Sequence, residues 1–307
     1  MRIAVLIPCY NEEAAISQTV ADFKKALPGA IVYVYDNNSK DRTVELARAA
    51  GAVVRSEPLQ GKGHVVRRMF ADIEADIYVM TDGDATYHAN SAPAMIQKLI
   101  DEHLDMVVGT RLHTDEAGAF RAGHQLGNHL ITGTVAWLFG DRFKDMLSGF
   151  RVFSRRFAKS FPALSKGFET ETELAVHALS LNMPVAEVET PYFARPPGSV
   201  SKLNTYRDGW RILKMIIALT KEERPLFFFG TLSALMAAGA VLLMVPVLLT
   251  YLETGLVPRF PTAILAASIM ILAFLSLASG FILDNVTCGR REIKRMIYLS
   301  HPAPGEG

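Results

Sequence analysis

Cysteine is nearly absent from this 307-residue chain, which has only Cys9 and Cys288, far apart in the sequence. We therefore expect no disulfide and no zinc site, and the eight histidines show no spacing typical of metal ligands. An excess of charge of one sign is also absent, because the formal net charge is +1. This balance argues against bulk binding to nucleic acid, and we expect no nucleic-acid partner.

Long apolar runs are missing outside the last third of the chain, and that third is the main reason for the mean hydropathy of +0.20. The run at the start, Arg2–Ile7, is too short for the apolar part of a signal peptide and ends at Pro8. We therefore expect this run to be a first β-strand, and we expect the N-terminal part not to be exported.

The last third contains two nearly charge-free runs, Leu226–Leu252 and Thr262–Leu283, separated by Glu253–Pro261. A helix that spans a bilayer needs about 20 mainly apolar residues, so each run is long enough. We predict a transmembrane helical hairpin, in which Pro246 kinks the first helix without ending it. The alternative is a pair of buried core helices, but the runs lack an amphipathic stripe.

Basic residues flank the predicted hairpin on both sides. They are Arg207, Arg211, Lys214, Lys221 and Arg224 before it, and Arg290, Arg291, Lys294 and Arg295 after it. Because cytoplasmic segments are enriched in Lys and Arg, both termini are predicted to be cytoplasmic. The chain is thus expected to be an integral protein of the inner (cytoplasmic) membrane.

The segment 206–225, just before the hairpin, mixes apolar residues such as Trp210 and Ile212 with Arg211 and Lys214. This composition suits an amphipathic helix lying in the membrane interface, and a packed connector helix is the alternative. The expected domains are an N-terminal domain at 1–205, this juxtamembrane helix at 206–225, two transmembrane helices at 226–283 and a cytoplasmic basic tail at 284–307.

Residues 1 to about 110 alternate short apolar runs with helical patterns, which is typical of βα units in a mostly parallel α/β sheet. The expected strands are Ile3–Ile7, Ile31–Tyr35, Ala52–Arg55, Ile77–Met80 and Met106–Val108. The expected helices are Glu13–Leu27, Arg42–Ala50, Gly63–Ile73 and Ala92–Glu102. In open sheets of this kind, ligands bind beyond the carboxyl ends of the strands.

Polar clusters follow three of the expected strands. They are Pro8–Glu12 after the first, Asp36–Asp41 after the second, and Asp82–Asp84 after the fourth. Two carboxylates one residue apart can hold Mg²⁺ or Mn²⁺, which usually bind through one or two carboxylates plus substrate phosphates. Taken singly, an Asp-Gly-Asp run is more often a turn, and Ser39 and Asp41 are equally well explained as helix caps. Three clusters on one sheet edge favour a binding site.

These motifs resemble those of family 2 glycosyltransferases of the GT-A fold. Within this family, the chain resembles polyprenyl-phosphate glycosyltransferases such as dolichyl-phosphate mannose synthase and bacterial undecaprenyl-phosphate glucosyltransferases. The matching segments are Pro8–Glu13, Asp36–Asp41, Gly61–Gly63, Asp82–Asp84, Gly109–Arg111, Asp145–Arg151 and Arg195–Leu203. The resemblance covers nearly the whole chain and implies a Rossmann-like GT-A domain at 1–205, followed by the two-helix hairpin.

The resemblance implies a nucleotide-sugar donor bound by Pro8, Tyr10, Glu12, Asp36, Asn38, Lys62, Asp82 and Gly83. Asp36 would accept a hydrogen bond from the N–H edge of uracil, and Lys62 would approach the phosphates from a glycine-flanked turn. An ordinary surface lysine is the alternative for Lys62. Asp82 and Asp84 would bind Mg²⁺ or Mn²⁺, with Asp84 as the preferred direct ligand. Family members often carry Gln where this chain has Thr86, so the third protein ligand is open.

The implied acceptor is a lipid phosphate, whose oxygen is already anionic and can attack the anomeric carbon without a strong general base. The residues expected to hold it are Arg111, Arg121, Asn128, Ser199, Ser201 and Lys202. The expected catalytic residues are Asp84, Arg111, Arg121 and Glu171, and a solvated surface role is the alternative for each arginine. Glu171 could act as a base, orient the acceptor, or cap the helix that follows it.

The leading function is therefore inverting, metal-dependent transfer of one hexosyl unit from a UDP-sugar to undecaprenyl or another polyprenyl phosphate. UDP-glucose is the first choice of donor, and UDP-galacturonate, a UDP-N-acetylhexosamine and GDP-mannose stay open. A processive polysaccharide synthase is disfavoured because Trp137 and Trp210 do not stand in its Gln-x-x-Arg-Trp motif. A non-catalytic membrane partner is disfavoured because the expected site residues are intact. We also expect a homo-oligomer, since a two-helix hairpin buries little surface alone.

Overall fold

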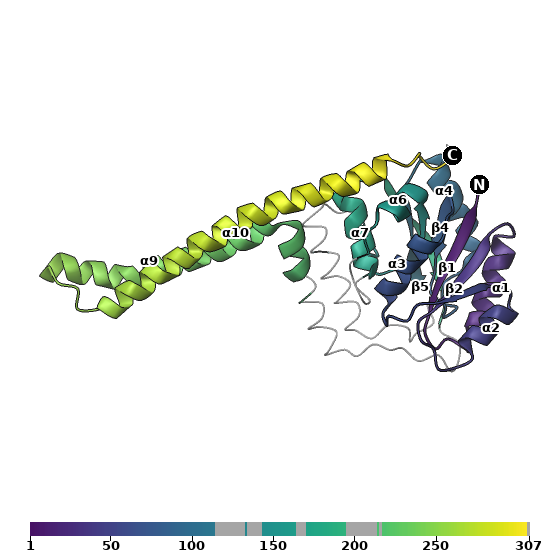
Figure 1. Cartoon of the computed structure of the whole chain (residues 1–307), viewed down its shortest axis with the longest axis horizontal. Helices are drawn as coiled ribbons and strands as arrows, with labels where there is room; N and C mark the ends of the chain where they lie inside the picture. Colours follow the sequence, from purple (N-terminus) through teal and green to yellow (C-terminus); the bar gives the residue numbers. More distant parts are fainter. Residues whose placement is uncertain (114–132, 134–142, 164–169, 195–213, 215–216, 306–307) are drawn as a thin grey trace. The chain divides into compact units, whose positions relative to one another are not determined.

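The computed structural model describes residues 1–113, 133, 143–163, 170–194, 214 and 217–305. Contacts divide the chain into two compact units. The first comprises Met1–Ile212 together with Ile293–Gly307, and the second comprises Leu213–Glu292. The first unit contains a sheet with flanking helices, and the second contains two long helices (Figure 1).

A seven-stranded sheet forms the centre of the first unit, in the order β3-β2-β1-β4-β6-β5-β7. Its strands are β1 (Ile3–Cys9), β2 (Ile31–Asp36), β3 (Val53–Ser56), β4 (Ile77–Met80), β5 (Met106–His113), β6 (Arg151–Ser154) and β7 (Val185–Tyr192). β6 is antiparallel to its neighbours β4 and β5, and the other pairs are parallel. The five strands expected from the apolar runs are present, and β5 extends far enough to carry Arg111. The predicted mostly parallel α/β fold is confirmed.

Helices cover both faces of the sheet (Figure 1). They are α1 (Ile16–Ala26), α2 (Thr43–Ala49), α3 (Lys62–Asp72), η1 (Ala89–Ser91), α4 (Ala92–Asp101), α6 (Arg155–Ser160) and α7 (Thr170–Ser180). α1, α2 and α4 share one core, which includes Phe23, Ala47 and Leu99. α3 contacts α6 and α7 on the other face. The sheet is therefore covered on both sides, as parallel sheets require.

Glu171 and Glu173, which alternate with threonines before Leu174, belong to a helix. Glu171 and Glu173 lie in the first turn of α7, where the helix dipole favours negative charge. This position agrees with the helix that was expected to follow Glu171.

The second unit contains α9 (Pro225–Thr254) and most of α10 (Phe260–Leu299), which run side by side (Figure 1). Both are long and apolar enough to cross a membrane. As predicted, Pro246 does not end the first helix, which continues to a left-handed cap at Gly255 with φ of 67°. α10 extends through much of the segment predicted as a tail. Its last turns, from Ile293 onward, belong to the first unit. The predicted domain boundaries stay predictions.

α9 and α10 pack through residues spaced seven apart. Apart from Pro225 at the start of α9, the buried positions are Ser233, Ala240 and Val247 on α9, and Ala266, Ala273, Gly280 and Thr287 on α10. The Ser276 hydroxyl donates to the Phe229 carbonyl across this seam at 3.1 Å. Small residues let two backbones approach closely, which is typical of helix pairs in membranes. Large apolar side chains elsewhere on the pair, such as Leu242 and Leu252, are exposed.

Candidate active site

The candidate site lies where the chain leaves β1, β2 and β4. Cys9 at the end of β1 pairs in register with Asp36 at the end of β2, and Leu6 of β1 pairs with Met80 at the end of β4. The three polar clusters therefore emerge at one edge of the sheet, as the parallel arrangement requires. Of the expected donor residues, Pro8, Tyr10 and Glu12 are half-buried at this edge.

The loops after β1 and β2 are tied to each other by side chains. The Asn11 N–H donates to Ser39 Oγ at 2.8 Å, and the Glu12 N–H donates to Thr43 Oγ1 at 2.8 Å. Asp41 accepts the Thr43 N–H at 3.0 Å at the start of α2. Asp41 thus supports the start of α2, in line with the capping explanation, whereas Ser39 joins the two loops.

Asp36 and Asn38 differ in where their side chains are directed. Asp36 is buried, and each of its carboxylate oxygens accepts the Ser39 N–H at 3.3 Å. Asn38 is exposed and donates to the Pro58 carbonyl at 2.9 Å and to Gln60 Oε1 at 3.3 Å. Asn38 is therefore engaged with the loop that leads into α3, and its role in donor binding stays a prediction.

Sequence reasoning missed Asn37, which holds the same loop. Its buried side chain donates to the carbonyls of Glu57 at 2.9 Å and Leu59 at 2.8 Å, and it accepts the Gly61 N–H at 2.7 Å. These partners lie 20 or more residues further along the chain, so no local signal could have found them. Asn37 fixes the approach to Lys62, the first residue of α3.

Lys62 joins two carboxylates that are distant in the sequence. Its Nζ donates to Asp82 Oδ1 and to Glu171 Oε1, each at 2.5 Å. Burial alone would lower the pKa of Lys62, but the charges and hydrogen bonds of Asp82 and Glu171 outweigh burial and raise the pKa. Lys62 is thus a largely buried, paired cation rather than an ordinary surface lysine.

Asp84 is buried and is oriented by Thr86. The Thr86 hydroxyl donates to Asp84 Oδ1 at 2.6 Å, and the Thr86 N–H donates to the same oxygen at 3.3 Å. Ala85 between them has φ of 57°, which is uncommon for a residue other than glycine. Thr86 therefore orients a carboxylate from the position where related proteins often carry glutamine, and a third metal ligand stays open.

Two glycines allow close packing around the carboxylate pair. A Cβ on Gly83 would lie 2.7 Å from Cys9 Sγ, and a Cβ on Gly149 would collide with the Asp82 carboxylate. The Gly149 N–H donates to the Tyr87 hydroxyl at 2.8 Å, which fixes this contact. Packing alone accounts for glycine at position 83, so the predicted role of Gly83 in donor binding stays a prediction.

Asp82 and Asp84 are the residues that could hold a divalent cation. Within the described ranges, no three or more histidine, cysteine, aspartate or glutamate side chains are arranged as a metal site. Two carboxylates are nevertheless the usual protein contribution to a Mg²⁺ or Mn²⁺ site that substrate phosphates complete. The donor set therefore fits a cation that is shared with a diphosphate.

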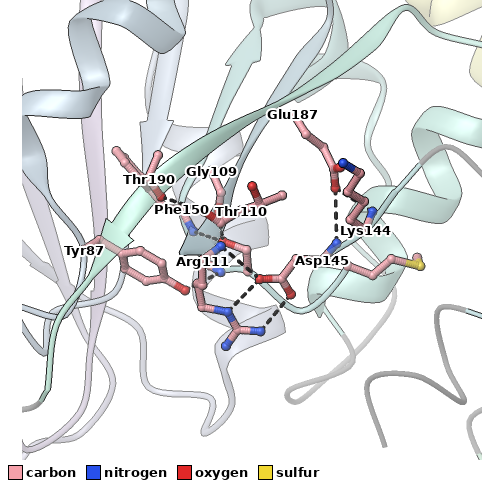
Figure 2. Close-up of polar contacts among 12 residues, drawn as sticks. Tyr87, Gly109, Thr110, Arg111, Lys144, Asp145, Phe150, Glu187 and Thr190 are labelled. Atoms are coloured by element: carbon pink, nitrogen blue, oxygen red, sulfur yellow. Dashed lines mark hydrogen bonds and ion pairs between the residues drawn. The ribbon is translucent and has the colours of Figure 1, made fainter. Parts of the chain in front are cut away.

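Arg111 on β5 forms a bidentate ion pair with Asp145 (Figure 2). Arg111 Nε donates to Asp145 Oδ2 and Nη2 donates to Oδ1, each at 2.7 Å. The guanidinium carbon also lies 5.6 Å from the centre of the Tyr192 ring. Glu187 on β7 braces the pair, because its carboxylate accepts the N–H groups of Lys144 at 2.8 Å and Asp145 at 3.2 Å.

For both Asp145 and Glu187, burial and the neighbouring hydrogen bonds shift the pKa in opposite directions. Burial would raise the pKa of Asp145, but the hydrogen bonds and charge of Arg111 outweigh it and lower the pKa. Burial raises the pKa of Glu187, and its two backbone hydrogen bonds offset this only in part. The Arg111 fork is thus held by an ionised carboxylate, and its predicted contact with an acceptor phosphate stays a prediction.

Sequence reasoning also missed the structural role of Arg151, which is fully buried in β6. Its Nε donates to the Ser148 carbonyl at 2.9 Å and its Nη2 donates to the Met146 carbonyl at 2.5 Å. Burial lowers the pKa of Arg151. The side chain therefore supports the loop whose Gly149 lies against Asp82. An arginine after a phenylalanine gives no sequence signal of such burial.

Several predicted acceptor residues cannot be placed in this geometry. Arg121, Asn128, Ser199, Ser201 and Lys202 lie outside the described residues. The described part of the chain therefore brings together Asp36, Lys62, Asp82, Asp84 and Glu171 near the ends of β1, β2 and β4, and it brings Arg111 together with Asp145.

The residues of the candidate site fall almost entirely within one stretch, 4–161, which matches a known family, described as glycosyl transferase family 2. The chain belongs to glycosyl transferase family 2. Glycosyltransferase AglJ of Haloferax volcanii is 36% identical over 230 residues, which cover 75% of this chain and 75% of that protein. The dolichyl-phosphate hexose transferase of the same organism is 30% identical over 222 residues, which cover 72% of this chain and 95% of that protein.

A solved structure shows the same fold for this family 2 chain. Glucosyl-3-phosphoglycerate synthase from Mycobacterium tuberculosis, in complex with Mn²⁺, UDP and glucosyl-3-phosphoglycerate, matches with a TM-score of 0.59 and 25% identity. The match covers 72% of this chain and 79% of that chain. The predictions of family, of a GT-A fold and of glycosyltransferase activity are confirmed.

Proposed function

We propose that this family 2 glycosyltransferase moves one hexosyl unit from a UDP-sugar, with inversion, to a polyprenyl phosphate at the cytoplasmic face of a membrane. The observation that carries the proposal is the contact of Lys62 with Asp82 beside Asp84, at the edge of the sheet where ligands bind. UDP-glucose is the proposed donor and undecaprenyl phosphate the proposed acceptor.

The donor side is supported by the charges of the described residues. The buried Asp36 offers carboxylate oxygens at the end of β2, and such oxygens can accept the N–H edge of uracil. The Lys62 ammonium offers a positive charge for a diphosphate. The Mycobacterium tuberculosis synthase in complex with UDP and Mn²⁺ supports the choice of nucleotide.

Asp82 and Asp84 would hold Mg²⁺ or Mn²⁺ in this proposal. A bound cation would supply positive charge that stabilises the departing nucleoside diphosphate. Thr86 keeps the Asp84 carboxylate in one orientation through its 2.6 Å hydrogen bond. Gly149 leaves the space that the Asp82 carboxylate occupies.

The acceptor side is supported by chemistry and by one relative. A phosphate oxygen is anionic at neutral pH, so positioning and electrostatics can replace a strong base. Arg111 is held in a fixed orientation by Asp145, and a guanidinium fork suits a phosphate. The similarity to a dolichyl-phosphate hexose transferase supports a lipid phosphate as acceptor.

The membrane location is supported by α9 and α10, two helices of sufficient length and apolarity to span a bilayer. We propose that both termini are cytoplasmic, because basic residues flank the hairpin on both sides. The donor and the lipid headgroup would then be accessible from the same compartment.

The test is a donor panel on membranes that contain the overproduced chain, undecaprenyl phosphate and Mn²⁺. Radiolabelled UDP-glucose, UDP-galacturonate, UDP-N-acetylglucosamine and GDP-mannose are added separately, and lipid-extractable label is counted. We expect label from UDP-glucose. Label from another donor would correct the sugar and keep the reaction class, whereas label only in non-extractable polymer, or no label at all, would contradict the proposal.

A further inference from the structure

Lys62, Asp82 and Glu171 form a cluster in which the Lys62 ammonium contacts both carboxylates. The Lys62 Nζ lies 2.5 Å from an oxygen of each acid. The exposed fractions of the side chains are 13% for Lys62, 32% for Asp82 and 8% for Glu171. Asp82 is the most open member, so the cluster meets solvent on the Asp82 side and is closed on the Glu171 side.

The three residues come from different elements, and the backbone alone does not fix the ammonium. Gly61, with φ of 132°, and the Asn37 bond to the Gly61 N–H set the start of α3. The lysine side chain is a flexible four-carbon chain, so its ammonium has a fixed position only when the ammonium itself makes contacts. In the part of the chain that the structure describes, those contacts are Asp82 and Glu171.

The same geometry makes Glu171 a poor general base. Its carboxylate is almost closed to solvent, and one oxygen is bound to Lys62. A base must reach the proton that it takes. The proposed acceptor is an anionic phosphate oxygen, which carries no proton that needs removal.

We propose that Glu171 is a positioning residue, which holds the Lys62 ammonium beside Asp82 so that Lys62 binds the diphosphate of the donor. An ammonium has three N–H donors, and the structure uses two of them on the carboxylates. The third is available for a phosphate oxygen on the open side of the cluster. This inference rests on the proposed function, because it takes a nucleoside diphosphate as the ligand.

The test is a double-mutant cycle on donor affinity, measured by calorimetric titration of the full-length protein in detergent with UDP and Mn²⁺. GDP, ADP and CDP are titrated in the same way, and the nucleotide that the wild type binds most tightly is used. We expect Lys62→Met and Glu171→Gln each to weaken binding about tenfold, and the double variant to bind no more weakly than either, since coupled residues are not additive. The KM for lipid phosphate should not change.

Glu173→Gln is the matched control, because it removes a carboxylate from the same turn of α7 without removing the Lys62 contact. It should bind the nucleotide like the wild type. Thermal unfolding of each variant shows whether it is folded. Should Glu171→Gln not fold, Glu171→Asp replaces it in the cycle, with the same loss expected because the shorter side chain retracts from Lys62.

Additive losses, about a hundredfold in the double variant, would overturn the inference. A Glu171→Gln variant with a lowered kcat and unchanged nucleotide affinity would overturn it as well, in favour of a base. A wild type that binds none of the nucleoside diphosphates with Mn²⁺ would contradict the proposed function itself, and the inference would fall with it.

Discussion

Arg111 and Asp145 are joined by two parallel N–H···O bonds of 2.7 Å, one from Nε and one from Nη2. Arg111 lies on β5, and Asp145 lies in the loop that precedes β6. Both side chains are largely buried, at 14% and 12% exposed. The pair therefore fixes the direction of a guanidinium close to Tyr87 (Figure 2).

Asp145→Asn should destabilise the first unit, because it leaves a buried guanidinium without its counter-charge. Loss of one partner of a buried pair costs about 3–5 kcal/mol. Glu102→Gln is the control, since Lys98 and Glu102 form a solvent-accessible pair at the end of α4 and such pairs contribute about 0.3–0.5 kcal/mol. Chemical denaturation in detergent measures both. Equal losses in the two variants would contradict this account of the Arg111 pair.

His177 should make stability depend on pH. Its imidazole is buried in α7, its Nε2 lies 3.0 Å from Ser160 Oγ, and burial, with a smaller effect of the Lys294 charge, lowers its pKa from 6.5 to about 3. The unfolded chain therefore binds this proton more readily than the folded one. The stability contributed by neutral His177 is fully present above pH 6.5 and is lost as the pH falls toward 3, by at most about 1.4 kcal/mol per pH unit.

Measured between pH 6.5 and 4, the free energy of unfolding of His177→Gln should fall less steeply than that of the wild type. Asp145 titrates below this range, because its pKa is lowered. Glu187, whose pKa is raised, is present in both proteins and contributes to both slopes alike. Identical slopes for the wild type and His177→Gln would show that the imidazole is not the group responsible.

Gly149→Ala should reduce transfer activity by displacing the Asp82 carboxylate, which occupies the space that a methyl group needs. The matched control is Gly29→Ala, where an added Cβ meets nothing within 4 Å. Initial rates with saturating acceptor and varied Mn²⁺ are the measurement. We expect about a tenfold higher Mn²⁺ requirement for Gly149→Ala, equivalent to about 1.4 kcal/mol. A Gly149→Ala enzyme with wild-type Mn²⁺ dependence would mean that Asp82 is not at the metal site.

Gly280→Leu should separate the two apolar helices. A Cβ at this position already lies 3.1 Å from the Phe229 Cβ and 3.5 Å from the Leu226 Cα, so a larger side chain cannot enter the seam. Gly239→Leu is the control on α9, where added atoms meet open space. Thermal unfolding in detergent should show a lower midpoint for Gly280→Leu alone. Equal midpoints would rule out the seam of residues spaced seven apart.

Much of the fold could be predicted because strands and helices leave local patterns. The five apolar runs that became β1 to β5 were short and bounded by polar turns, and the carboxyl ends of three of them placed Asp36 and Asp82 at one edge. β6 and β7 were not predicted from the sequence. Arg151 begins β6 as a buried charge, and β7 mixes Glu187 and Glu189 with apolar residues.

The partnerships within the site could not be predicted, because they join residues far apart in the sequence. Lys62 and Glu171 are separated by 109 positions, and Arg111 and Asp145 by 34. A motif indicates which side chains carry charge, but only the folded chain shows which charges neutralise one another. The seam between α9 and α10 is different, since its small residues recur every seven positions and were open to prediction.

The central claim is that Asp82 and Asp84 hold a cation needed for transfer to a lipid phosphate. It is tested most directly by initial rates of the purified full-length protein, with radiolabelled UDP-glucose and undecaprenyl phosphate, before and after chelation with EDTA. The account predicts that EDTA abolishes lipid-linked label, that Mn²⁺ restores it, and that Asp84→Asn is slower by about a hundredfold or more. Transfer that continues undiminished in EDTA and in Asp84→Asn would contradict the account.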